Sequence, residues 1–530
     1  MTTSHRPLHV RWLGRVPYRE ALALQEGFFS HGVDQHLLLC EHPHVFTYGP
    51  GADLSTNLRC EPSAVDAELV EVQRGGDITY HGPGQLVGYP ILSLDPKHGD
   101  SGPADTRAYI TALEQSLIDA LGELGLTDVG RMGEYPGVWV EPNGPRPRKI
   151  AAIGVRVGNG STQRRTMHGF ALNVTTDLTY MREHIVPCGI AEYAVTSLAE
   201  EGIAITMREV VDVVARHVAT RFATSITRAD VAWDYAPDDA GLSIGARKPD
   251  WIRPKVNHTA QVLATKRTLR DLDLVTVCEE AGCPNLSECW SDGTATFMVL
   301  GDRCTRACGF CLIDTRKPLA PDAHEPLRVA EAVARMDLEF AVLTMVARDD
   351  LADGGMAHVA ECVRAIRDRT PGVQVETLVS DAKGSSAIDV LFAERPDVFN
   401  HNVETIARLQ RTVRPSAGYA RSLAVLSRAK GHGLTTKSGF MVGLGETDDE
   451  IGELLCDLAS VGVDIVTIGQ YLRPSSAHLP VVRYVEPAVF ADYKRIGESL
   501  GIAHVESGPL TRSSYHAKEA SRRSLPLTAV

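Results

Sequence analysis

Six of the 11 cysteines of this chain lie between positions 278 and 311, in two groups of three. The groups have the patterns Cys278-x4-Cys283-x5-Cys289 and Cys304-x3-Cys308-x2-Cys311. Thiolates on short loops converge on iron–sulfur clusters, because sulfur is a soft ligand for iron. Three cysteines leave one iron of a four-iron cluster open to another ligand. The spacing therefore predicts two four-iron clusters, each with one reactive corner.

A zinc site is the alternative for the second group, but structural zinc usually takes four ligands in paired spacing. The second group also follows an apolar segment, TATFMVL (294–300), that is typical of a β-strand. Barrel enzymes place their active sites on loops after the strands. The position favours a catalytic cluster over zinc.

Strand-like and helix-like segments alternate after the cysteines. Helical periods are expected at Leu327–Met336, Met356–Asp368, Tyr419–Gly431 and Asp448–Val461. Apolar strands are expected at 294–300, 340–346, 373–379, 397–403, 435–443 and 464–471. Six such units predict a parallel, partly closed (β/α)6 barrel.

The cysteine loop after the first strand resembles the radical S-adenosylmethionine (SAM) superfamily, in which the open iron binds the methionine amine and carboxylate. The second half as a whole is similar to lipoyl synthases. The similarity rests on the segments CEEAGCPNLSECWSDGTATFMVLGDRCTRACGFC, RDDLADGG (348–355), NHNVET (400–405), TKSGFMVGLGET (436–447), IGQYLRPS (468–475), HLPVVRYV (478–485) and RSSYH (512–516).

This resemblance implies that Cys304, Cys308 and Cys311 hold the radical SAM cluster. It implies a second, auxiliary [4Fe-4S] cluster on Cys278, Cys283, Cys289 and a serine of the RSSYH motif, Ser514 in the first place and Ser513 in the second. The auxiliary cluster would be consumed as the sulfur donor. Serine oxygen binds iron less tightly than thiolate, so one iron can leave when a substrate carbon takes sulfide. The resemblance implies insertion of two sulfurs at C6 and C8 of an octanoyl chain.

The first half contains a second set of reactive residue types. The segment RGGDITYH (74–81) has a Gly-Gly bend that suits either a hairpin or a binding loop. Lys149 stands at the start of an apolar run, and Cys188 lies in VPCGI. A thiolate is a good nucleophile, and a neighbouring ammonium lowers its pKa. A buried inert cysteine and a surface lysine remain the alternatives at this point.

Together, RGGDITYH, KIAAIG, HGFALNV (168–174) and PCG resemble the octanoyltransferases of the biotin/lipoate ligase-like fold. The resemblance implies that octanoyl moves from acyl carrier protein to Cys188 as a thioester, then to a lysine of a lipoyl domain, with Lys149 as activator. ATP-dependent lipoate ligases share the fold but need no cysteine nucleophile, so Cys188 favours the transferase. The implied pocket residues are Arg74, Gly75, Gly76, Asp77, Ile78, Thr79, Tyr80, His81, Ala152, Ile153, Gly154, Gly169, Phe170 and Ala171.

The first half mixes strand-like segments with helical periods at Tyr18–Phe29 and Thr106–Leu124, which predicts an α+β domain around a mixed sheet. Residues 234–254 are rich in proline, glycine and charge and are expected to be a linker. We therefore expect an octanoyltransferase domain at 1–233 and a lipoyl synthase domain at 255–530.

The net charge of −13 argues against a general nucleic-acid binder. No apolar run reaches the length of about 18 residues that a membrane span needs. We expect a cytoplasmic enzyme, because cluster assembly needs free thiols. The resemblances imply two [4Fe-4S] clusters and SAM as cofactors. The implied partners are octanoyl-acyl carrier protein, the lipoyl domains of 2-oxoacid dehydrogenases, the glycine cleavage H protein and an electron donor.

Acyl carrier proteins are generally acidic, so Arg146, Arg148, Arg164 and Arg165 are candidates for a docking surface, with ordinary solvated charges as the alternative. Two other functions compete with lipoylation. One is a different sulfur-inserting radical enzyme of the biotin synthase kind. The other is a non-catalytic iron–sulfur scaffold or redox sensor with a degenerate ligase domain.

Overall fold

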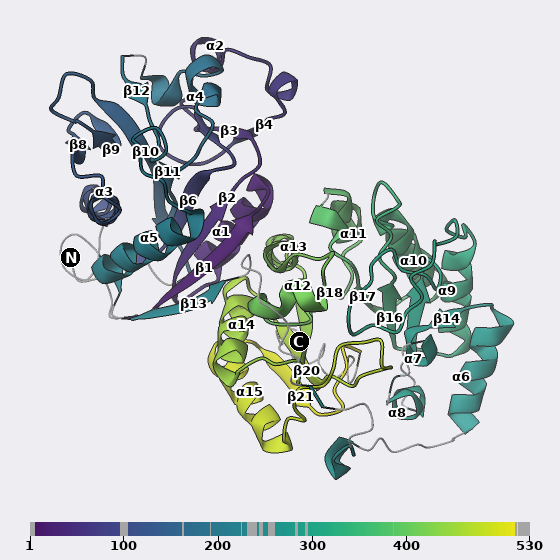
Figure 1. The fold of residues 1–530 in the computed structure, drawn as a ribbon. Helices are drawn as coiled ribbons and strands as arrows, with labels where there is room; N and C mark the ends of the chain where they lie inside the picture. Colours follow the sequence, from purple (N-terminus) through teal and green to yellow (C-terminus); the bar gives the residue numbers. More distant parts are fainter. Residues whose placement is uncertain are drawn as a thin grey trace. The chain divides into compact units, whose positions relative to one another are not determined.

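The computed structural model describes residues 6–95, 104–161, 164–190, 192–223, 225–230, 241–242, 247–252, 260–280, 283, 285–291, 295–384, 386–514 and 517. The side chains of 188, 230, 261, 287, 288 and 291 are outside this description. The chain divides into two compact units, Met1–Trp233 and Asp234–Val530 (Figure 1). Most of the expected linker lies outside the described residues. Within the described part, no helix has both the length and the hydropathy to cross a membrane.

The first unit is built on a ten-stranded mixed sheet. Strand β1 pairs in parallel with β2 and β13, and the pairs from β2 through β6, β11, β10 and β9 to β8 are antiparallel. The order across the sheet is β13 (Ile226–Asp230), β1 (Leu8–Arg15), β2 (Gln35–Glu41), β6 (Gln85–Ile91), β11 (Arg164–Asn173), β10 (Arg148–Asn159), β9 (Tyr135–Val140) and β8 (Val129–Met132). Two short strands extend it, β12 (Ala194–Val195) beside β10 and β7 (Ser93–Leu94) beside β11. The expected mixed sheet is confirmed.

Helices cover both faces of this sheet. Alternate residues of a strand face opposite sides, and Val10 and Trp12 of β1 join the apolar core under α3 (Thr106–Glu123) and α5 (Met207–Phe222). Helix α1 (Tyr18–Ser30) contacts β6 and β11, and its Phe28 packs edge-on against His36 of β2 on the other face. The other short elements are β3 (Val45–Tyr48), β4 (Glu68–Glu71), β5 (Thr79–His81), α2 (Leu54–Asn57) and α4 (Thr179–Glu183). Strands β4, β3 and β5 form a small separate sheet.

The second unit contains an eight-stranded sheet in sequence order. Strand β14 is antiparallel to β15, and all pairs from β15 to β21 are parallel. The strands are β14 (Val275–Thr276), β15 (Ala295–Val299), β16 (Phe340–Met345), β17 (Gln374–Leu378), β18 (Val398–Asn400), β19 (Thr436–Val442), β20 (Ile465–Gln470) and β21 (His504–Gly508). The six expected strands are all present. The seventh parallel strand, β21, was not expected.

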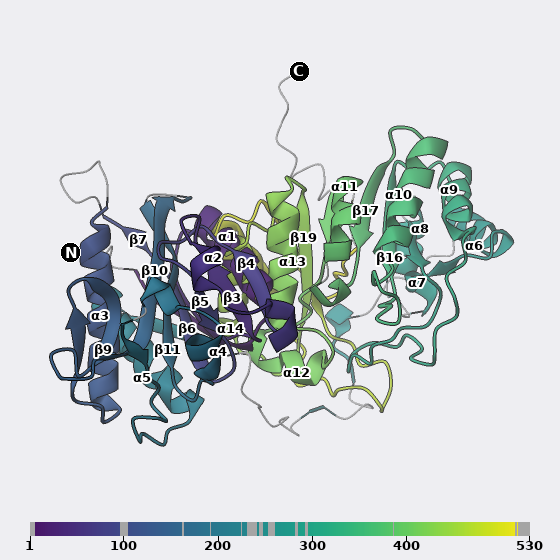
Figure 2. The same ribbon diagram turned by 90° about the horizontal axis from the view of Figure 1, so that it is seen from above.

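Helices between the strands complete the βα units. They include α9 (Glu325–Arg335), α10 (Met356–Arg369), α11 (Asp389–Ala393), α13 (Tyr419–Gly431), α14 (Asp448–Ser460) and α15 (Pro487–Ser499). Helices α9 and α10 contact each other and lie next to β16 in both views (Figures 1 and 2). Strand β20 is buried along its whole length, as expected for a parallel strand covered on both sides. This mostly parallel sheet directs the loops after its strands toward one end of the unit.

Candidate active sites

The second cysteine group lies on the loop that follows β15, at the carboxyl ends of the parallel strands. Backbone hydrogen bonds tie this loop to the loops after other strands. The N–H of Thr305 donates to the oxygen of Ala347 at 3.0 Å, and that of Gly309 to Val413 at 2.9 Å. His478 contacts the carbonyl oxygen of Cys311 at 3.0 Å. The loop is therefore held over the mouth of the sheet before any metal binds.

The three thiols of this loop lie close enough to change one another's pKa. The pKa of Cys311 is raised to about 12, chiefly by burial and also by the nearby Cys308 and Cys304, while the backbone of Ile313 opposes the shift. Burial likewise raises the pKa of Cys308. A metal that binds here would release the protons of these thiols, because it stabilises the thiolate form. The donor set fits an iron–sulfur cluster with one iron open.

Arg306 lies between two cysteines of this loop and was not singled out from the sequence. It is 5% exposed and donates to both oxygens of Asp349 at 2.9 Å and to Asp381 at 2.6 Å. Burial opposes the ionisation of Asp381, but the Arg306 guanidinium outweighs it and lowers the pKa of that carboxyl. An arginine inside a cysteine triplet, with an aspartate after a strand, is the sequence signal for this network. The network fixes the loop to β16 and β17.

The first cysteine group lies on two short helices after β14. Cys278 is on α7 (Val277–Glu280) and Cys289 on α8 (Leu286–Ser291), with Cys283 between them. The N–H of Cys283 donates to the oxygen of Cys278 at 3.0 Å. The pKa of Cys278 is raised to about 11, chiefly by burial and also by the nearby Cys283. Two of the three cysteines are thus neighbours in space.

A segment near the C-terminus, which contains Leu510 and Arg512, lies beside the first cysteine group. Asn285 donates from Nδ2 to the oxygen of Leu510 at 2.6 Å. Burial lowers the pKa of Arg512, which lies close enough to Cys283 to interact with it electrostatically. The segment that precedes the two serines therefore lies beside the first cysteine group, although more than 200 residues separate them in sequence.

The two candidate serines differ in their contacts. Asn402, after β18, donates from Nδ2 to the Ser513 hydroxyl at 2.7 Å and to Glu404 at 3.0 Å. The other amide atom of Asn402, Oδ1, is buried and has no hydrogen-bond partner among the described residues. Ser514 makes no hydrogen bond within the described part of the chain. Ser513 is therefore engaged with the barrel, and no such contact ties Ser514 to the described residues.

In the first unit, one pocket gathers most of the expected binding residues from β5, β10, β11 and the loop before β5. Its lining includes Arg74, Gly75, Gly76, Thr79, His81, Ala152, Ile153, Gly154, Gly169, Phe170 and Ala171. Tyr18, Val87, Tyr89 and His168 also line it and were not expected. Asp77, Ile78 and Tyr80 adjoin this segment without lining the pocket.

Glycines let the pocket walls approach. A Cβ atom on Gly154 would lie 3.2 Å from both Arg74 Cδ and the oxygen of Gly75, and one on Gly169 would lie 2.1 Å from the oxygen of Gly88. Arg74 donates to the carbonyl and hydroxyl oxygens of Thr47 at 2.7 and 3.0 Å. The loop of Arg74 and Gly75 is therefore fixed over β10 rather than free.

Apart from the Arg74 guanidinium, the titratable groups of the pocket that show a shifted pKa are held neutral by burial. The pKa of His81 is lowered to about 3, chiefly by burial and also by His42 and Arg74, while its hydrogen bond to Gln85 opposes the shift. Burial also raises the pKa of Tyr18 to about 12. The rings of Tyr18 and His81 stack with centroids 5.8 Å apart. A pocket of neutral aromatic and glycine surfaces suits an uncharged acyl chain.

The structure brings the loop that contains Cys188 to both other expected elements. Gly189 lies against Asp77, since a Cβ atom there would be 3.2 Å from Asp77 Oδ2. Strand β12, which follows the loop, pairs with β10 in the register Lys149 to Val195. The Lys149 side chain is buried, with Nζ 5.1 Å from the centre of the Trp139 ring. The side chain of Cys188 lies outside the described residues.

The expected docking arginines have different surroundings. Arg165 is fully buried and donates to the oxygen of Asp34 at 2.8 Å, and burial lowers its pKa to about 10. Its place on a docking surface was wrong, because a buried guanidinium cannot reach a partner. Arg148 is held by Glu201, with both hydrogen bonds at 2.6 Å. Of the four, Arg146 is the exposed one.

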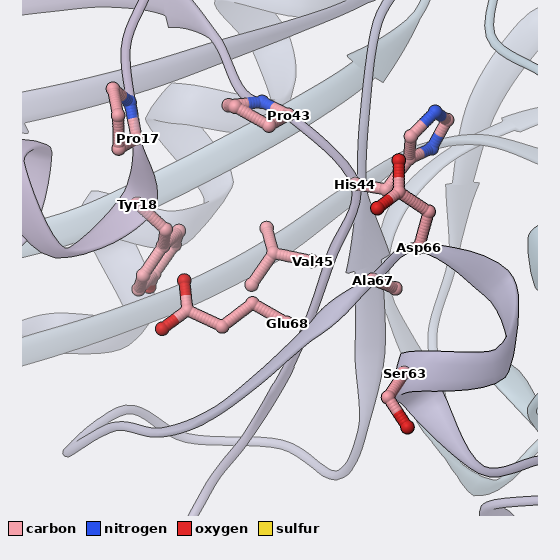
Figure 3. Close-up of a pocket in the computed structure, with 9 residues that line it drawn as sticks. All are labelled: Pro17, Tyr18, Pro43, His44, Val45, Ser63, Asp66, Ala67 and Glu68. Atoms are coloured by element: carbon pink, nitrogen blue, oxygen red, sulfur yellow. The ribbon is translucent and has the colours of Figure 1, made fainter.

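A second hollow of about 420 Å³ in the first unit is drawn in Figure 3, and it shares Tyr18 with the pocket that Arg74 and His81 line. Its lining includes Asp66 and Glu68 but no cysteine or lysine. Arg19 pairs with Glu68 at its edge. The hollow therefore offers neither a thiol nor an ammonium for acyl transfer.

Two family models match separate parts of the chain. The lipoyl protein ligase A/B catalytic domain matches residues 17–219, and the radical SAM superfamily matches residues 298–458. Among curated proteins, the lipoyl synthase of Rubrobacter xylanophilus is 54% identical over 275 residues, which are 51% of this chain and 86% of that protein. The lipoyl synthase of Chlorobaculum parvum is 52% identical over 275 residues, 51% of this chain and 94% of that protein.

Solved structures resemble one unit at a time. A bipartite lipoate protein ligase from Thermoplasma acidophilum is 18% identical, with a TM-score of 0.36, and covers 43% of this chain and 88% of that chain. Methylornithine synthase is 14% identical, with a TM-score of 0.32, and covers 40% of this chain and 71% of that chain.

Proposed function

The chain belongs to the lipoyl synthase family through its second half, and on this premise we propose that it makes lipoyl-lysine on proteins in two consecutive reactions. A lipoate ligase/transferase-type domain is fused to a radical SAM lipoyl synthase domain. The first reaction moves octanoyl from acyl carrier protein to a lysine of a lipoyl domain. The second inserts two sulfurs into that octanoyl chain.

In the first reaction, the Cys188 thiolate attacks the thioester carbonyl of octanoyl-acyl carrier protein. The carrier thiol leaves, and octanoyl remains on Cys188 as a thioester. The amine of the acceptor lysine then attacks this thioester, releases the Cys188 thiolate and loses a proton. Lys149 supports the thiolate with its positive charge. The closeness of the Cys188 loop to β10 and Asp77 supports these roles.

The pocket beside this loop would hold the octanoyl chain. Its small residues Ala152, Gly154, Gly169 and Ala171 lie on the paired strands β10 and β11 and add little side-chain bulk to the pocket, and His81 is neutral. We also propose that acyl carrier protein supplies the octanoyl group and that an electron donor serves the second reaction. We propose a lipoyl domain as the acceptor, because the lipoyl protein ligase family model and the lipoyl synthase relatives both concern lipoyl groups.

In the second reaction, the chain's own residues would hold SAM and iron–sulfur clusters. We assign the SAM-binding cluster to Cys304, Cys308 and Cys311, whose loop is fixed over the mouth of the sheet. When bound, SAM supplies a 5′-deoxyadenosyl radical that breaks an unactivated C–H bond, which a side-chain base cannot deprotonate. The Oδ1 atom of Asn402 is buried without a hydrogen-bond partner among the described residues, and a polar ligand could donate a hydrogen bond to it.

We assign a second, auxiliary cluster to Cys278, Cys283 and Cys289, with Ser514 as its oxygen ligand. The hydrogen bond of Ser513 to Asn402 and the position of Arg512 beside Cys283 favour Ser514 over Ser513. Cluster assembly needs reduced thiols, so the proposal places the enzyme in a reducing compartment.

The high identity to lipoyl synthases over nearly their whole length is the observation that carries this proposal. Its test is mass spectrometry of an apo lipoyl domain after anaerobic incubation with the reconstituted full chain, octanoyl-acyl carrier protein, SAM and a reductant. We expect octanoylated and then lipoylated lysine. An unmodified domain, or one that stops at octanoyl-lysine, would contradict the first or the second reaction respectively.

Iron analysis separates this proposal from a scaffold or sensor. Two four-iron clusters predict about eight irons per reconstituted chain, whereas about four would mean that one site is vestigial. The fusion itself would raise the local concentration of the second site around the freshly octanoylated domain, to the millimolar range for a short tether. Equal rates from the intact chain and from separately expressed halves, mixed at low concentration, would contradict this advantage.

A further inference from the structure

His168 on β11 lines the acyl pocket but has no role in the proposed reaction. It is 2% exposed, and neither ring nitrogen makes a hydrogen bond of good geometry with another residue in the described part of the chain, although the backbone of Gln73 lies close enough to affect its pKa. Buried polar side chains are normally paired. An imidazole without such a partner in the wall of a pocket is therefore placed to interact with a molecule that occupies the pocket.

The position of His168 is maintained by a specific contact. Its φ of +60° lies in the left-handed region, which a residue with a Cβ atom rarely adopts. Gln25 of α1, a fully buried residue, accepts the His168 backbone N–H at 2.9 Å and holds this conformation. Such backbone strain concentrates at functional sites.

The imidazole is neutral at physiological pH. The pKa of His168 is lowered to about 4, chiefly by burial and also by the charges of Arg74 and Arg156, while the backbone of Gln73 opposes the shift. A neutral imidazole presents one N–H donor and one acceptor nitrogen. The pocket wall at this point is therefore polar but uncharged.

The sheet register sets the direction in which an acyl chain would lie. Lys149 pairs with Val195, just after the Cys188 loop, whereas His168 pairs with Val155, six residues further along β10. Six strand residues span about 20 Å, which accommodates a lysine side chain and a medium-length acyl chain end to end. Ala152 and Gly154 lie between these two points. The thioester end thus belongs near Lys149 and the methyl end near His168.

We propose that His168 sets the acyl chain length, by ending the pocket with a polar group beside which further methylenes are not buried favourably. The inference rests on the proposed octanoyl transfer. A chain of eight carbons that stops short of the imidazole leaves room for water to pair with it. A longer chain displaces that water and leaves both ring nitrogens unpaired, which costs free energy. The site therefore selects a medium-length saturated acyl group.

The test is acyl loading of the full chain from acyl carrier protein that bears 6, 8, 10 or 12 carbons, followed by intact-mass spectrometry. We expect the wild-type chain to load eight carbons fastest. His168→Leu, which replaces the imidazole with an apolar group of similar size, should raise the rate for ten carbons relative to eight about tenfold. His168→Gln retains a donor and an acceptor and should keep the wild-type preference.

His217→Ala is the matched control, because this histidine is on α5 and does not line the pocket. Thermal unfolding identifies variants that fail to fold, and His168→Ala then serves as the second apolar variant. An unchanged ratio of ten to eight carbons in folded His168→Leu or His168→Ala would overturn the inference. Absence of any acyl group on the wild-type chain would overturn octanoyl transfer itself, which is a distinct result.

Discussion

The two units build their reactive sites in opposite ways. In the second unit, six cysteines on two short stretches of sequence form the candidate metal sites, and the fold mainly fixes those loops through groups such as Arg306. In the first unit, the pocket is assembled from β5, β10, β11 and α1, whose residues are far apart in sequence. Metal ligands on loops reveal their chemistry by spacing, whereas a pocket between strands depends on register.

The charges around the two candidate sites also differ. The acyl pocket is lined by neutral groups such as His81 and His168, whose charged forms burial disfavours. The radical site combines buried thiols with a buried arginine between two aspartates. The first arrangement suits an uncharged substrate, and the second suits ligands that become anionic when metal binds.

The largest expected effect is a reciprocal loss of the two reactions. Cys188→Ala should lower octanoyl transfer by roughly 10³-fold or more, because the nucleophile is gone, and should spare sulfur insertion into a pre-octanoylated lipoyl domain. Cys308→Ala should abolish sulfur insertion, halve the iron content and spare octanoyl transfer. Mass spectrometry of the domain and iron analysis measure both. If either variant loses both reactions while folded, the two sites are not independent.

The neutral histidines predict different acid sensitivity in the two units. The folded-state pKa of His81 is about 3 and that of His168 about 4, below the unfolded value near 6.5. Between those values the unfolded chain binds more protons, so stability falls as pH drops from about 6.5 toward 4. The loss is up to about 1.4 kcal/mol per pH unit for each such histidine.

His36 and His42 of the first unit are lowered in the same way by burial. In the described part of the second unit, His401 is the histidine for which a lowered pKa is resolved. Hydrogen exchange followed by mass spectrometry at pH 7 and pH 5 should therefore show a larger loss of protection in the first unit. Equal losses in both units would contradict the assignment of these histidines as buried and neutral.

The two serines of the C-terminal motif give a sharper test of the second site. Ser514→Cys would supply a fourth thiolate, so sulfur insertion should fall about 100-fold, at unchanged iron content, because thiolate releases iron less readily than serine oxygen. Ser513→Ala removes only a hydrogen bond to Asn402, worth about 1 kcal/mol, and should lower the rate several-fold. Single-turnover sulfur insertion and iron analysis measure both. The reverse order of effects would make Ser513 the ligand.

Much of this architecture follows from local sequence. The strands β15 to β20 are apolar runs between amphipathic helices, and their parallel order was predicted from that alternation. Strand β21, HVESG, is short and half polar, so its membership in the sheet depends on pairing with β20 rather than on its own pattern. Pairing with a neighbouring strand therefore determines the β21 strand, which the local residue pattern does not predict.

Burial of single polar residues was harder to predict. In the sequence, Arg165 follows Arg164 and resembles a surface charge. Its position on β11 directs it into the interior, where it donates hydrogen bonds to Asp34 and Ser93. His168 stands in the segment that was identified from sequence, but its left-handed backbone and unpaired ring appear only in the folded register. One sequence does not show which polar groups the fold leaves unsatisfied.

The smallest expected effect concerns docking of the acyl carrier protein. Arg146 is the exposed arginine among the four candidates, so Arg146→Glu should raise the KM for the acidic carrier about three-fold, and the effect should shrink at higher salt. Octanoyl loading from a small thioester should be unchanged. Arg107→Glu, an equal charge change on the exposed side of α3, is the matched control. An equal rise in KM for both variants would mean that the carrier senses net charge rather than a docking surface beside the acyl pocket.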